Sequence, residues 1–268
     1  METKLIEFKN KENETLRGIM TMPDGAVKKS AVFLHGFERN ATVEKKFKQM
    51  AGALAQKEIA SFRFDASGCG LSDGDFSKTT VEKRSSEMMA ALNIFKNKFG
   101  DIKISFVAHS LGACVLAKEL DKLESLIGKI ILIAPGLNQK DILRYYFARD
   151  LMKFKKPGLK ILFDNYKQYF DENQFLAMIN KGDKIVNKWN YIGKQYFLEV
   201  KDLDFSHSFD SMKNKILHVH GTADPKVPLE SLGIVFPNRI IVPGGDHDLE
   251  RPDFWEQWFS QAVNFLEK

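Results

Sequence analysis

Residues 104–117 of the chain read ISFVAHSLGACVLA, and they indicate the fold more clearly than any other stretch. The apolar run before Ser110 is typical of a buried strand, whereas the run after it is rich in residues that favour a helix. The small residues Ala108 and Gly112 lie two positions to either side of Ser110. A strand that turns sharply into a helix needs such small neighbours, because larger side chains would clash. Ser110 is therefore predicted at the carboxyl end of a strand with its hydroxyl exposed.

Apolar runs of the same kind recur along the chain, with helical patterns between them. They are SAVFLHG (30–36), EIASFRFD (58–65), IKISFVAHS (102–110), KIILIAPG (129–136), KILHVHG (215–221) and NRIIVPGG (238–245). This alternation is typical of a parallel sheet with helices on both faces. Ahead of these runs, LIEFKN and TLRGIMTMP indicate a hairpin. We therefore predict an α/β fold whose twisted, mostly parallel sheet has an antiparallel N-terminal hairpin.

Helices are predicted between the strands from the spacing of apolar residues. The first is expected to begin at Thr42 as its N-cap, with a buried face formed by Val43, Phe47, Met50, Ala51 and Leu54. Others are expected over Val81–Phe99 and from Leu111 to Leu120. Pro252 opens a closing helix whose core-facing stripe contains Trp255, Trp258, Phe259, Ala262 and Phe265.

The alternation breaks once, over residues 137–206. This segment follows the sixth expected strand, so it leaves and returns at the carboxyl edge of the sheet, where open α/β sheets bind ligands. We expect 137–206 to form an inserted cap subdomain, and 1–136 with 207–268 to form the core domain. The segment contains all six tyrosines, several phenylalanines and Trp189. Tyrosine suits the boundary of a ligand cleft, although we expect most of the six to pack the cap's own core.

Composition excludes several classes of protein. With 268 residues and 44% hydrophobic content, the chain can bury one large core. It has neither the roughly 20 consecutive apolar residues of a membrane span nor a secretory signal at its start, so we expect a soluble, cytoplasmic protein without membrane insertion. Lys and Arg alternate with Asp and Glu almost everywhere, which argues against nucleic-acid binding, and most of the net charge of +5 comes from residues 137–206, with 13 Lys and Arg against 9 Asp and Glu. Cys69 and Cys114 lack metal-ligand neighbours, and we expect no metal and no cofactor.

Three residues that follow separate predicted strands can act together. A serine hydroxyl needs a positioned base to be a nucleophile near neutral pH, and that base needs an orienting carboxylate. His247 in GGDHD follows the last strand, and Asp224 in HGTADPKVP follows the strand before it. Because the carboxyl ends of parallel strands meet at one edge of the sheet, we predict Ser110 as nucleophile, Asp224 as acid and His247 as base.

Other acidic residues and histidines fit these roles less well. Asp141 follows the preceding strand, whereas Asp246 and Asp248 are sequence neighbours of the predicted base and project differently from the same loop. His109 is expected on the other side of its strand by alternation. His35, in the motif HGF, is expected to hold its own loop.

A serine nucleophile also requires two preorganised N–H donors for the developing oxyanion. The backbone of Leu111 is one candidate, because it lies at the amino end of a helix, where the helix dipole favours negative charge. The other is the backbone N–H of Phe37, in the loop after SAVFLHG.

The chain resembles the α/β-hydrolase fold. Within that fold it is similar to serine hydrolases related to cinnamoyl and feruloyl esterases and to serine aminopeptidase-like lipases. The motifs HGF, RFDASGCGLSDG, AHSLGA, HGTADPKVP and GGDHD occur in the order of that family and cover nearly everything outside the cap. Carried over to this sequence, the resemblance implies the nucleophile Ser110, the acid Asp224, the base His247 and the oxyanion donors Phe37 and Leu111.

The leading hypothesis is a carboxylesterase acting on small-molecule esters, including aromatic acyl esters. A peptidase or amidase, and a thioesterase or acyltransferase, would use the same residues. Cinnamoyl esterases usually carry Gln where this chain has Leu111, a departure that bears on hydroxycinnamate preference and leaves the backbone donor in place. Substrate-binding candidates in the cap are Gln139, Tyr145, Tyr166 and Tyr169. The sequence is compatible with a homodimer.

Overall fold

Eight strands form one mixed sheet in the computed structural model, which describes residues 1–100, 102–187 and 190–268. Their order is β1-β2-β4-β3-β5-β6-β9-β10. The strands are β1 (Glu2–Lys9), β2 (Thr15–Met22), β3 (Lys29–Leu34), β4 (Ile59–Phe64), β5 (Ile104–His109), β6 (Ile127–Ile133), β9 (Ile216–Gly221) and β10 (Asn238–Val242). The β1 and β2 strands pair antiparallel, β2 joins β4 antiparallel, and all pairs from β4 to β10 are parallel. The predicted hairpin and six parallel strands are confirmed.

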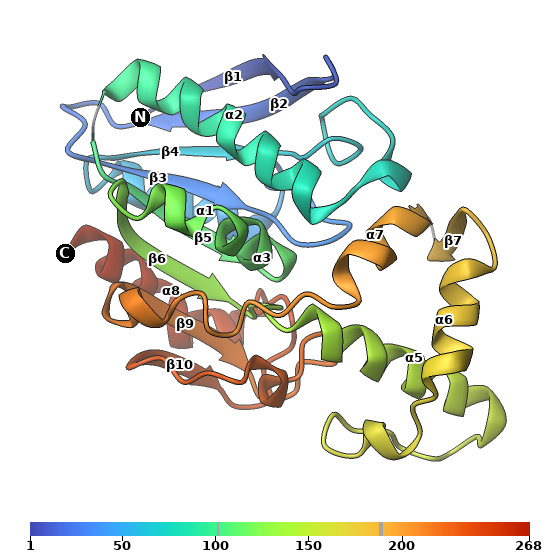
Figure 1. Ribbon diagram of the computed structural model, residues 1–268. Helices are drawn as coiled ribbons and strands as arrows, with labels where there is room; N and C mark the ends of the chain where they lie inside the picture. Colours follow the sequence, from blue (N-terminus) through green and yellow to red (C-terminus); the bar gives the residue numbers. More distant parts are fainter. Residues whose placement is uncertain (101, 188–189) are drawn as a thin grey trace.

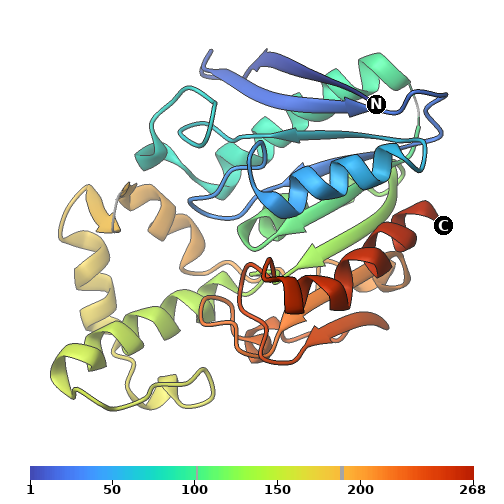
Figure 2. The ribbon, with the colours of Figure 1, turned by 180° about the vertical axis from the view of Figure 1, so that it is seen from behind.

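Helices cover both faces of this sheet (Figures 1 and 2). The α-helices are α1 (Lys45–Ala55), α2 (Val81–Phe99), α3 (Leu111–Lys118), α4 (Leu120–Leu123), α5 (Gln139–Lys155), α6 (Glu172–Asn180), α7 (Lys194–Val200) and α8 (Pro252–Glu267). Short 3-10 turns occur at η1 (Phe76–Lys78), η2 (Tyr166–Gln168), η3 (Asp210–Lys215) and η4 (Leu229–Leu232). In the part of the chain that the structure describes, none of the helices has both the length and the apolar character that crossing a bilayer requires.

The core is divided by the sheet into two layers. Strand residues that alternate along β3 separate accordingly: Val32 and Leu34 join the cluster under α2 and α3, whereas Ala31 and Phe33 join the cluster under α1 and α8. This division follows from the two-residue period of a strand, and it explains why the parallel strands are apolar throughout. Trp258 of the predicted stripe is fully buried in the second cluster.

The start of α1 differs from the prediction. The helix begins at Lys45 rather than just after Thr42, and Val43 is 66% exposed instead of buried. The Asp65 carboxylate explains this, because it accepts the backbone N–H of Ala41 at 2.7 Å and of Thr42 at 3.0 Å. It also accepts the Thr42 hydroxyl at 2.6 Å. With its hydroxyl bonded to Asp65, Thr42 is not available to cap the helix.

The segment 137–206 lies beyond the carboxyl ends of the parallel strands (Figure 1). It contains α5, α6, α7 and a small antiparallel pair, β7 (Lys184–Asn187) and β8 (Asn190–Gly193). Its two ends are joined by hydrogen bonds from Phe205 N to Leu137 O at 3.0 Å and from Lys140 N to Leu203 O at 2.9 Å. This geometry is compatible with an inserted cap, which stays a prediction. Trp189 lies outside the described residues.

The junction between β3 and α3 depends on a glycine. A Cβ added at Gly112 would lie 2.4 Å from Leu34 O and 3.1 Å from His35 O. Both neighbours are backbone atoms, so they cannot rotate away as a flexible side chain can. The absence of a side chain at Gly112 therefore sets how closely the start of α3 approaches the end of β3.

We expect Gly112→Ala to destabilise the protein by about 1–3 kcal/mol, because the added methyl group overpacks a backbone contact. Gly52→Ala in α1 is the matched control, since a Cβ there meets nothing within 4 Å. That change should stabilise the protein by about 0.5–1 kcal/mol through helix propensity. Urea unfolding of both variants measures the two effects. Effects of the same sign would contradict the argument.

Candidate active site

Ser110 occupies a strained turn between β5 and α3. Its φ of 55° and ψ of −120° lie in a region that residues other than glycine rarely adopt. The turn is held by hydrogen bonds from Ser110 N to Ile133 O at 3.0 Å and from Gly136 N to Ser110 O at 3.2 Å. The predicted sharp turn from strand to helix is therefore present, and its backbone is fixed by the adjoining end of β6.

Asp224 and His247 form a buried pair at the ends of β9 and β10. His247 Nδ1 lies 2.7 Å from Asp224 Oδ2. The other carboxylate oxygen, Oδ1, accepts the backbone N–H of Lys226 at 2.8 Å and of Val227 at 2.9 Å. Because a carboxylate only accepts, His247 donates its Nδ1–H, which leaves Nε2 free to accept a proton. This is the tautomer that a general base requires.

The loops that carry this pair are bonded to each other. Ala223 N donates to Gly245 O at 3.0 Å, and Gly244 N donates to the Thr222 hydroxyl at 2.8 Å. A Cβ at Gly221 would lie 2.1 Å from Gly245 O, so only glycine allows this approach. The positions of acid and base are thus coupled through the backbone.

Two further histidines lie behind the acid. His220 Nε2 is 2.8 Å from Val227 O and 3.5 Å from Asp224 Oδ2. Since a carbonyl only accepts, the proton is on Nε2, and Nδ1 accepts from His218 Nε2 at 3.0 Å. Burial raises the pKa of the Asp224 carboxyl, but hydrogen bonds from His220 and His247 outweigh it and hold that pKa below its ordinary value. Burial lowers the pKa of His218 to about 3, so this ring is neutral.

His109 packs against the predicted base, His247, and hydrogen-bonds to its backbone. Its fully buried ring lies 4.8 Å from the His247 ring, and its Nε2 is 3.1 Å from His247 O. Burial lowers the pKa of His109 well below its ordinary value. The neutral ring therefore donates Nε2–H to the backbone of the loop that carries His247. Alternation along the strand gave no indication of this contact.

His109, the residue before Ser110, contacts the loop that carries His247. Among the described residues, the Ser110 hydroxyl forms no hydrogen bond with His247. Catalytic hydrogen bonds in free enzymes are often long and tighten when substrate binds. The pair of His247 and Asp224 is therefore assembled, whereas its contact with Ser110 stays a prediction.

The two predicted oxyanion donors both belong to segments that adjoin Ser110. Leu111 begins α3, directly after it, and Phe37 follows Gly36, where an added Cβ would lie 3.1 Å from Ser110 Cβ. Within the described chain, neither the Leu111 nor the Phe37 backbone N–H donates to a protein acceptor. Both amides are consequently free to bind an oxygen of a ligand, as oxyanion donors must be.

The rival acids have other partners. Asp246 Oδ1 accepts the backbone N–H of Leu249 at 2.8 Å, and Asp248 pairs with the Arg39 guanidinium at 2.6 Å. Asp141 lies in the first turn of α5, where the Asn138 side chain accepts its backbone N–H. In the ranges that the structure describes, none of these three carboxylates is bonded to His247.

The four predicted substrate-binding residues fall into two groups. Gln139 is close to the serine turn, because its Nε2 donates to Gly136 O at 2.7 Å. Tyr145 and Tyr166 are buried in a cluster of the segment 137–206, with Tyr169 packed against it. Their roles toward substrate stay predictions, and the cluster gives the tyrosines a packing role.

The structure also shows contacts that the sequence did not indicate. The Tyr146 hydroxyl donates to Lys226 O, and the Arg149 guanidinium donates to Pro225 O at 3.2 Å. Helix α5 therefore touches the loop of Asp224. Over the described part of the chain, no group of three or more His, Cys, Asp and Glu side chains is arranged to hold a metal ion.

Comparisons with known proteins agree with this architecture. A family model described as "Serine aminopeptidase, S33" matches residues 25–190, more than half of the chain. Among curated proteins no match was found. Similar solved structures are α/β hydrolases, and the strand order and helical layers above are those of the α/β-hydrolase fold.

Three of these structures illustrate the similarity. Est1E from Butyrivibrio proteoclasticus with bound ferulic acid is 18% identical, with a TM-score of 0.68 over 98% of this chain and 96% of that one. The esterase domain of a Rhodothermus marinus protein is 17% identical, with a TM-score of 0.66 over 100% and 98%. Pyrococcus furiosus esterase Pf2001 is 19% identical, with a TM-score of 0.66 over 99% and 91%. Identities this low establish the fold alone.

If the predicted triad is correct, Asp224→Asn should lower hydrolytic activity by about four orders of magnitude, the loss that a Ser-His-Asp triad shows when its acid becomes an amide. The two backbone N–H groups of Lys226 and Val227 will keep the amide oxygen, so the amide NH₂ must face His247 Nδ1. The imidazole proton then moves to Nε2, and the ring cannot accept a proton from Ser110. Asp246→Asn is the control, and it should keep activity within about tenfold of the wild type. Steady-state rates on an ester measure both.

The same substitution should change how stability depends on pH. The pKa of Asp224 is depressed in the folded state, so the carboxylate contributes stability above its unfolded pKa of about 4 and loses it as the pH falls further. Asp224→Asn should therefore cost roughly 1–3 kcal/mol at pH 7. The difference from wild type should shrink below about pH 4. A difference that is constant with pH in urea unfolding would argue against this ionised pair.

Proposed function

The chain belongs to the serine aminopeptidase S33 family of α/β hydrolases, and we propose that it hydrolyses carboxylic esters with Ser110, His247 and Asp224. The observation that carries the proposal is the bond of 2.7 Å between His247 Nδ1 and Asp224 Oδ2, at the same edge of the sheet as a serine in a strained turn. A buried carboxylate that fixes the tautomer of a histidine is the usual way to activate a serine.

The proposed reaction proceeds through an acyl-enzyme. Ser110 Oγ attacks the ester carbonyl carbon while its proton moves to His247 Nε2. The carbonyl π electrons pass to oxygen, and the oxyanion accepts the N–H groups of Phe37 and Leu111. When the C–O bond breaks, His247 returns the proton to the leaving alcohol. Water then repeats the sequence at the acyl carbon and releases the acid together with free Ser110.

The segment 137–206 supplies the cap of the proposed site. Tyr146 and Arg149 bond to the loop that carries Asp224, and the Tyr196 ring stacks on Phe37 with 4.7 Å between centroids. The segment thus contacts both the loop that carries Asp224, called the acid loop below, and the loop that carries Phe37, called the oxyanion loop below. Gln139 lies beside the Tyr196 hydroxyl at 3.5 Å. Together these side chains would cover the proposed site with aromatic surface and a few polar groups, a combination typical of small-molecule sites.

Esters with aromatic acyl groups suit this aromatic cover over the proposed site. The similar structure of Est1E holds ferulic acid, which supports the choice of an aromatic acyl class. A second candidate is an amidase that releases aminoacyl groups, and the description of the matched family favours it. Both activities would use the same three residues, because an amide passes through the same acyl-enzyme.

We expect the purified protein to hydrolyse p-nitrophenyl esters, including aromatic acyl esters, and to leave aminoacyl p-nitroanilides nearly intact. An amine is a poorer leaving group than a phenol, so amide turnover needs additional binding groups. Initial rates over a panel from acetyl to hydroxycinnamoyl esters, with the anilides alongside, measure the preference. Comparable rates on anilides would favour the aminopeptidase. Turnover of acetyl esters alone would count against the aromatic acyl class.

A fluorophosphonate probe should label the wild type covalently and leave Ser110→Ala unlabelled. Ester turnover in that variant should fall by about six orders of magnitude, as in other enzymes that lose this nucleophile. Ser72→Ala is the matched control, because it removes a serine hydroxyl from a loop of the core. Labelling of Ser110→Ala, detected on a gel and by mass spectrometry, would overturn the assignment of the nucleophile.

A further inference from the structure

Arg84 is a buried cation close to the proposed site, and it has no role in the reaction described above. It lies in the first turns of α2 and is only 4% exposed. Its Nε donates to the Thr79 hydroxyl at 2.9 Å, and one Nη lies 3.4 Å from Cys69 Sγ. Burial raises the pKa of that thiol, so it is neutral. Among the described residues, Arg84 forms no ion pair with a carboxylate.

A buried charge with only neutral partners is strongly unfavourable unless some other group compensates it. The rings of Phe37 and Phe76 compensate part of the Arg84 charge, with centroids 6.0 and 5.9 Å from the guanidinium carbon. Cation–π contacts at this distance are weak compared with a carboxylate. Because no described carboxylate is within ion-pair distance of Arg84, its guanidinium can respond to negative charge that develops nearby during a reaction.

The remaining donor of Arg84 reaches the oxyanion loop. Its Nη1 donates to Gly36 O at 3.1 Å, and His35 Nδ1 lies 2.8 Å from the same oxygen. Ala66 N donates to His35 Nε2 at 3.0 Å, so Nε2 is unprotonated and Nδ1 carries the hydrogen. Burial, followed by the charge of Arg84, lowers the pKa of His35 to about 3, which keeps the ring neutral. Two donors thus hold one carbonyl oxygen.

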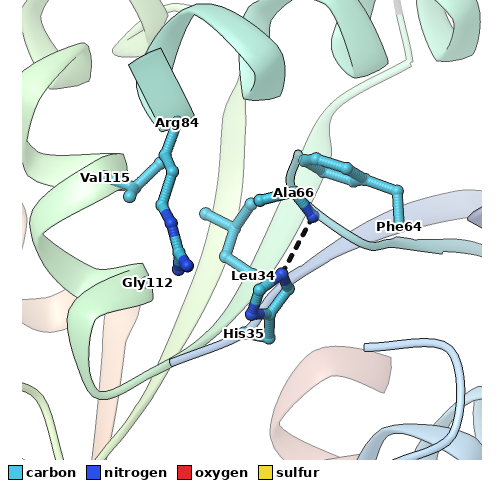
Figure 3. A pocket seen from close by; sticks show the side chains of 7 residues that line it. All are labelled: Leu34, His35, Phe64, Ala66, Arg84, Gly112 and Val115. Atoms are coloured by element: carbon cyan, nitrogen blue, oxygen red, sulfur yellow. Dashed lines mark hydrogen bonds between the residues drawn. The ribbon is translucent and has the colours of Figure 1, made fainter. Parts of the chain in front are cut away.

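Figure 3 shows how these groups converge. The Arg84 side chain extends from α2 toward Gly112 and the end of β3, and His35 reaches across to Ala66. They line a small cavity of about 20 Å³ together with Leu34, Phe64 and Val115. This space is too small for a substrate acyl group. It lies on the side of the oxyanion loop that faces the sheet and α2.

The carbonyl of Gly36 and the N–H of Phe37 belong to one peptide group. A trans peptide is planar, so its C=O and N–H point in opposite directions. Fixing the oxygen toward Arg84 therefore fixes the N–H of Phe37 on the opposite side. Gly36 itself packs against Ser110, with a hypothetical Cβ 3.1 Å from Ser110 Cβ. The orientation of the predicted oxyanion donor thus follows from the hydrogen bonds to its carbonyl.

We propose that Arg84 is a positioning residue for the oxyanion hole, acting with His35 through the peptide group that joins Gly36 to Phe37. The guanidinium orients the Phe37 N–H and polarises it, because a hydrogen bond to the carbonyl strengthens the donor at the other end of the same peptide. Its charge also stabilises the oxyanion in a site of low dielectric constant. This inference rests on the proposed function of Ser110.

The first test compares Arg84→Met with wild type on a p-nitrophenyl ester. Removing one oxyanion donor typically costs 10²- to 10³-fold in rate, so we expect kcat to fall by about 10- to 100-fold when the donor is only misaligned. KM should stay within about twofold, because the substrate's ground state carries no oxyanion. Affinity for a trifluoromethyl ketone, which forms a tetrahedral oxyanion adduct with the serine, should fall by the same factor as kcat.

Arg63→Met is the matched control. Arg63 is also a buried arginine that donates to backbone carbonyls, those of Ala41 and Thr42, but neither carbonyl is in the peptide before Phe37. Its replacement should lower the melting temperature while kcat and ketone affinity stay within about threefold of wild type. Equal losses of kcat in the two variants would reduce Arg84 to a structural role and overturn the inference.

Arg84→Lys covers the case in which Arg84→Met fails to fold. An ammonium group keeps the positive charge but loses the fork that holds Gly36 O and the Thr79 hydroxyl together. We expect kcat to fall by about tenfold with KM unchanged, and ketone affinity to fall in parallel. A folded Arg84→Lys with wild-type kcat and ketone affinity would overturn the inference.

Fluorophosphonate labelling separates this inference from the proposed function. If the wild type is not labelled, the proposed function fails, and the role of Arg84 fails with it. If the wild type is labelled and Arg84→Met reacts at the same rate, only the role of Arg84 is overturned. Slower labelling of Arg84→Met than of Arg63→Met supports both.

Discussion

The contact between the start of α3 and the end of β3 is the constraint on which the candidate site depends. Gly112 brings the helix against the carbonyls of Leu34 and His35. Ser110, in the turn just before this contact, has a strained backbone conformation, and the side chain of Leu111 belongs to the cluster against which Phe37 packs. A larger residue at position 112 would push the start of α3, and Ser110 with it, away from the end of β3. Strain at Ser110 is therefore retained by packing that the rest of the sheet stabilises.

The polar groups behind the site are buried, and their partners decide what each can do. Asp224 stays ionised because backbone amides and two histidines donate to it. His109 and His35 are neutral, and each serves as a fixed hydrogen-bonding group for a loop. Arg84 differs from these because its charge has no carboxylate partner among the described residues. A site that must accept transient negative charge gives such a cation a physical role.

The segment 137–206 is attached to the core at more places than its hydrogen-bonded ends. Besides the bonds from α5 to the loop of Asp224, Asn190 Nδ2 donates to Glu38 Oε1 at 2.9 Å, and Tyr196 stacks on Phe37. Apolar residues of α6 and α7 also share a cluster with Leu111 and Phe76. The segment therefore contacts both the loop of Asp224 and the loop of Phe37. Its aromatic residues thus contact these loops, Tyr146 one and Tyr196 the other, and also pack the segment internally.

The sequence by itself determined the strands of the main sheet and their order along the chain. Apolar runs fixed the six parallel strands, and helical spacing gave α2 its observed bounds, Val81–Phe99. The positions of Ser110, Asp224 and His247 after separate strands predicted that they converge, and the bond between His247 and Asp224 agrees with this. These features are readable because strand and helix periods are local, and because parallel strands bring their carboxyl ends to one edge.

Only the tertiary structure decided which polar groups lie behind the site. The start of α1 was misplaced because the Asp65 carboxylate, from a distant strand end, bonds the amides and hydroxyl that were expected to begin the helix. Arg84 falls on the same helix face as the buried residues Val81 and Met88, and this was the one local signal that it is buried. Its partner, Gly36 O, lies 48 positions away in the chain. Such long-range partners have no sequence period, since they depend on how strand ends and helices meet in space.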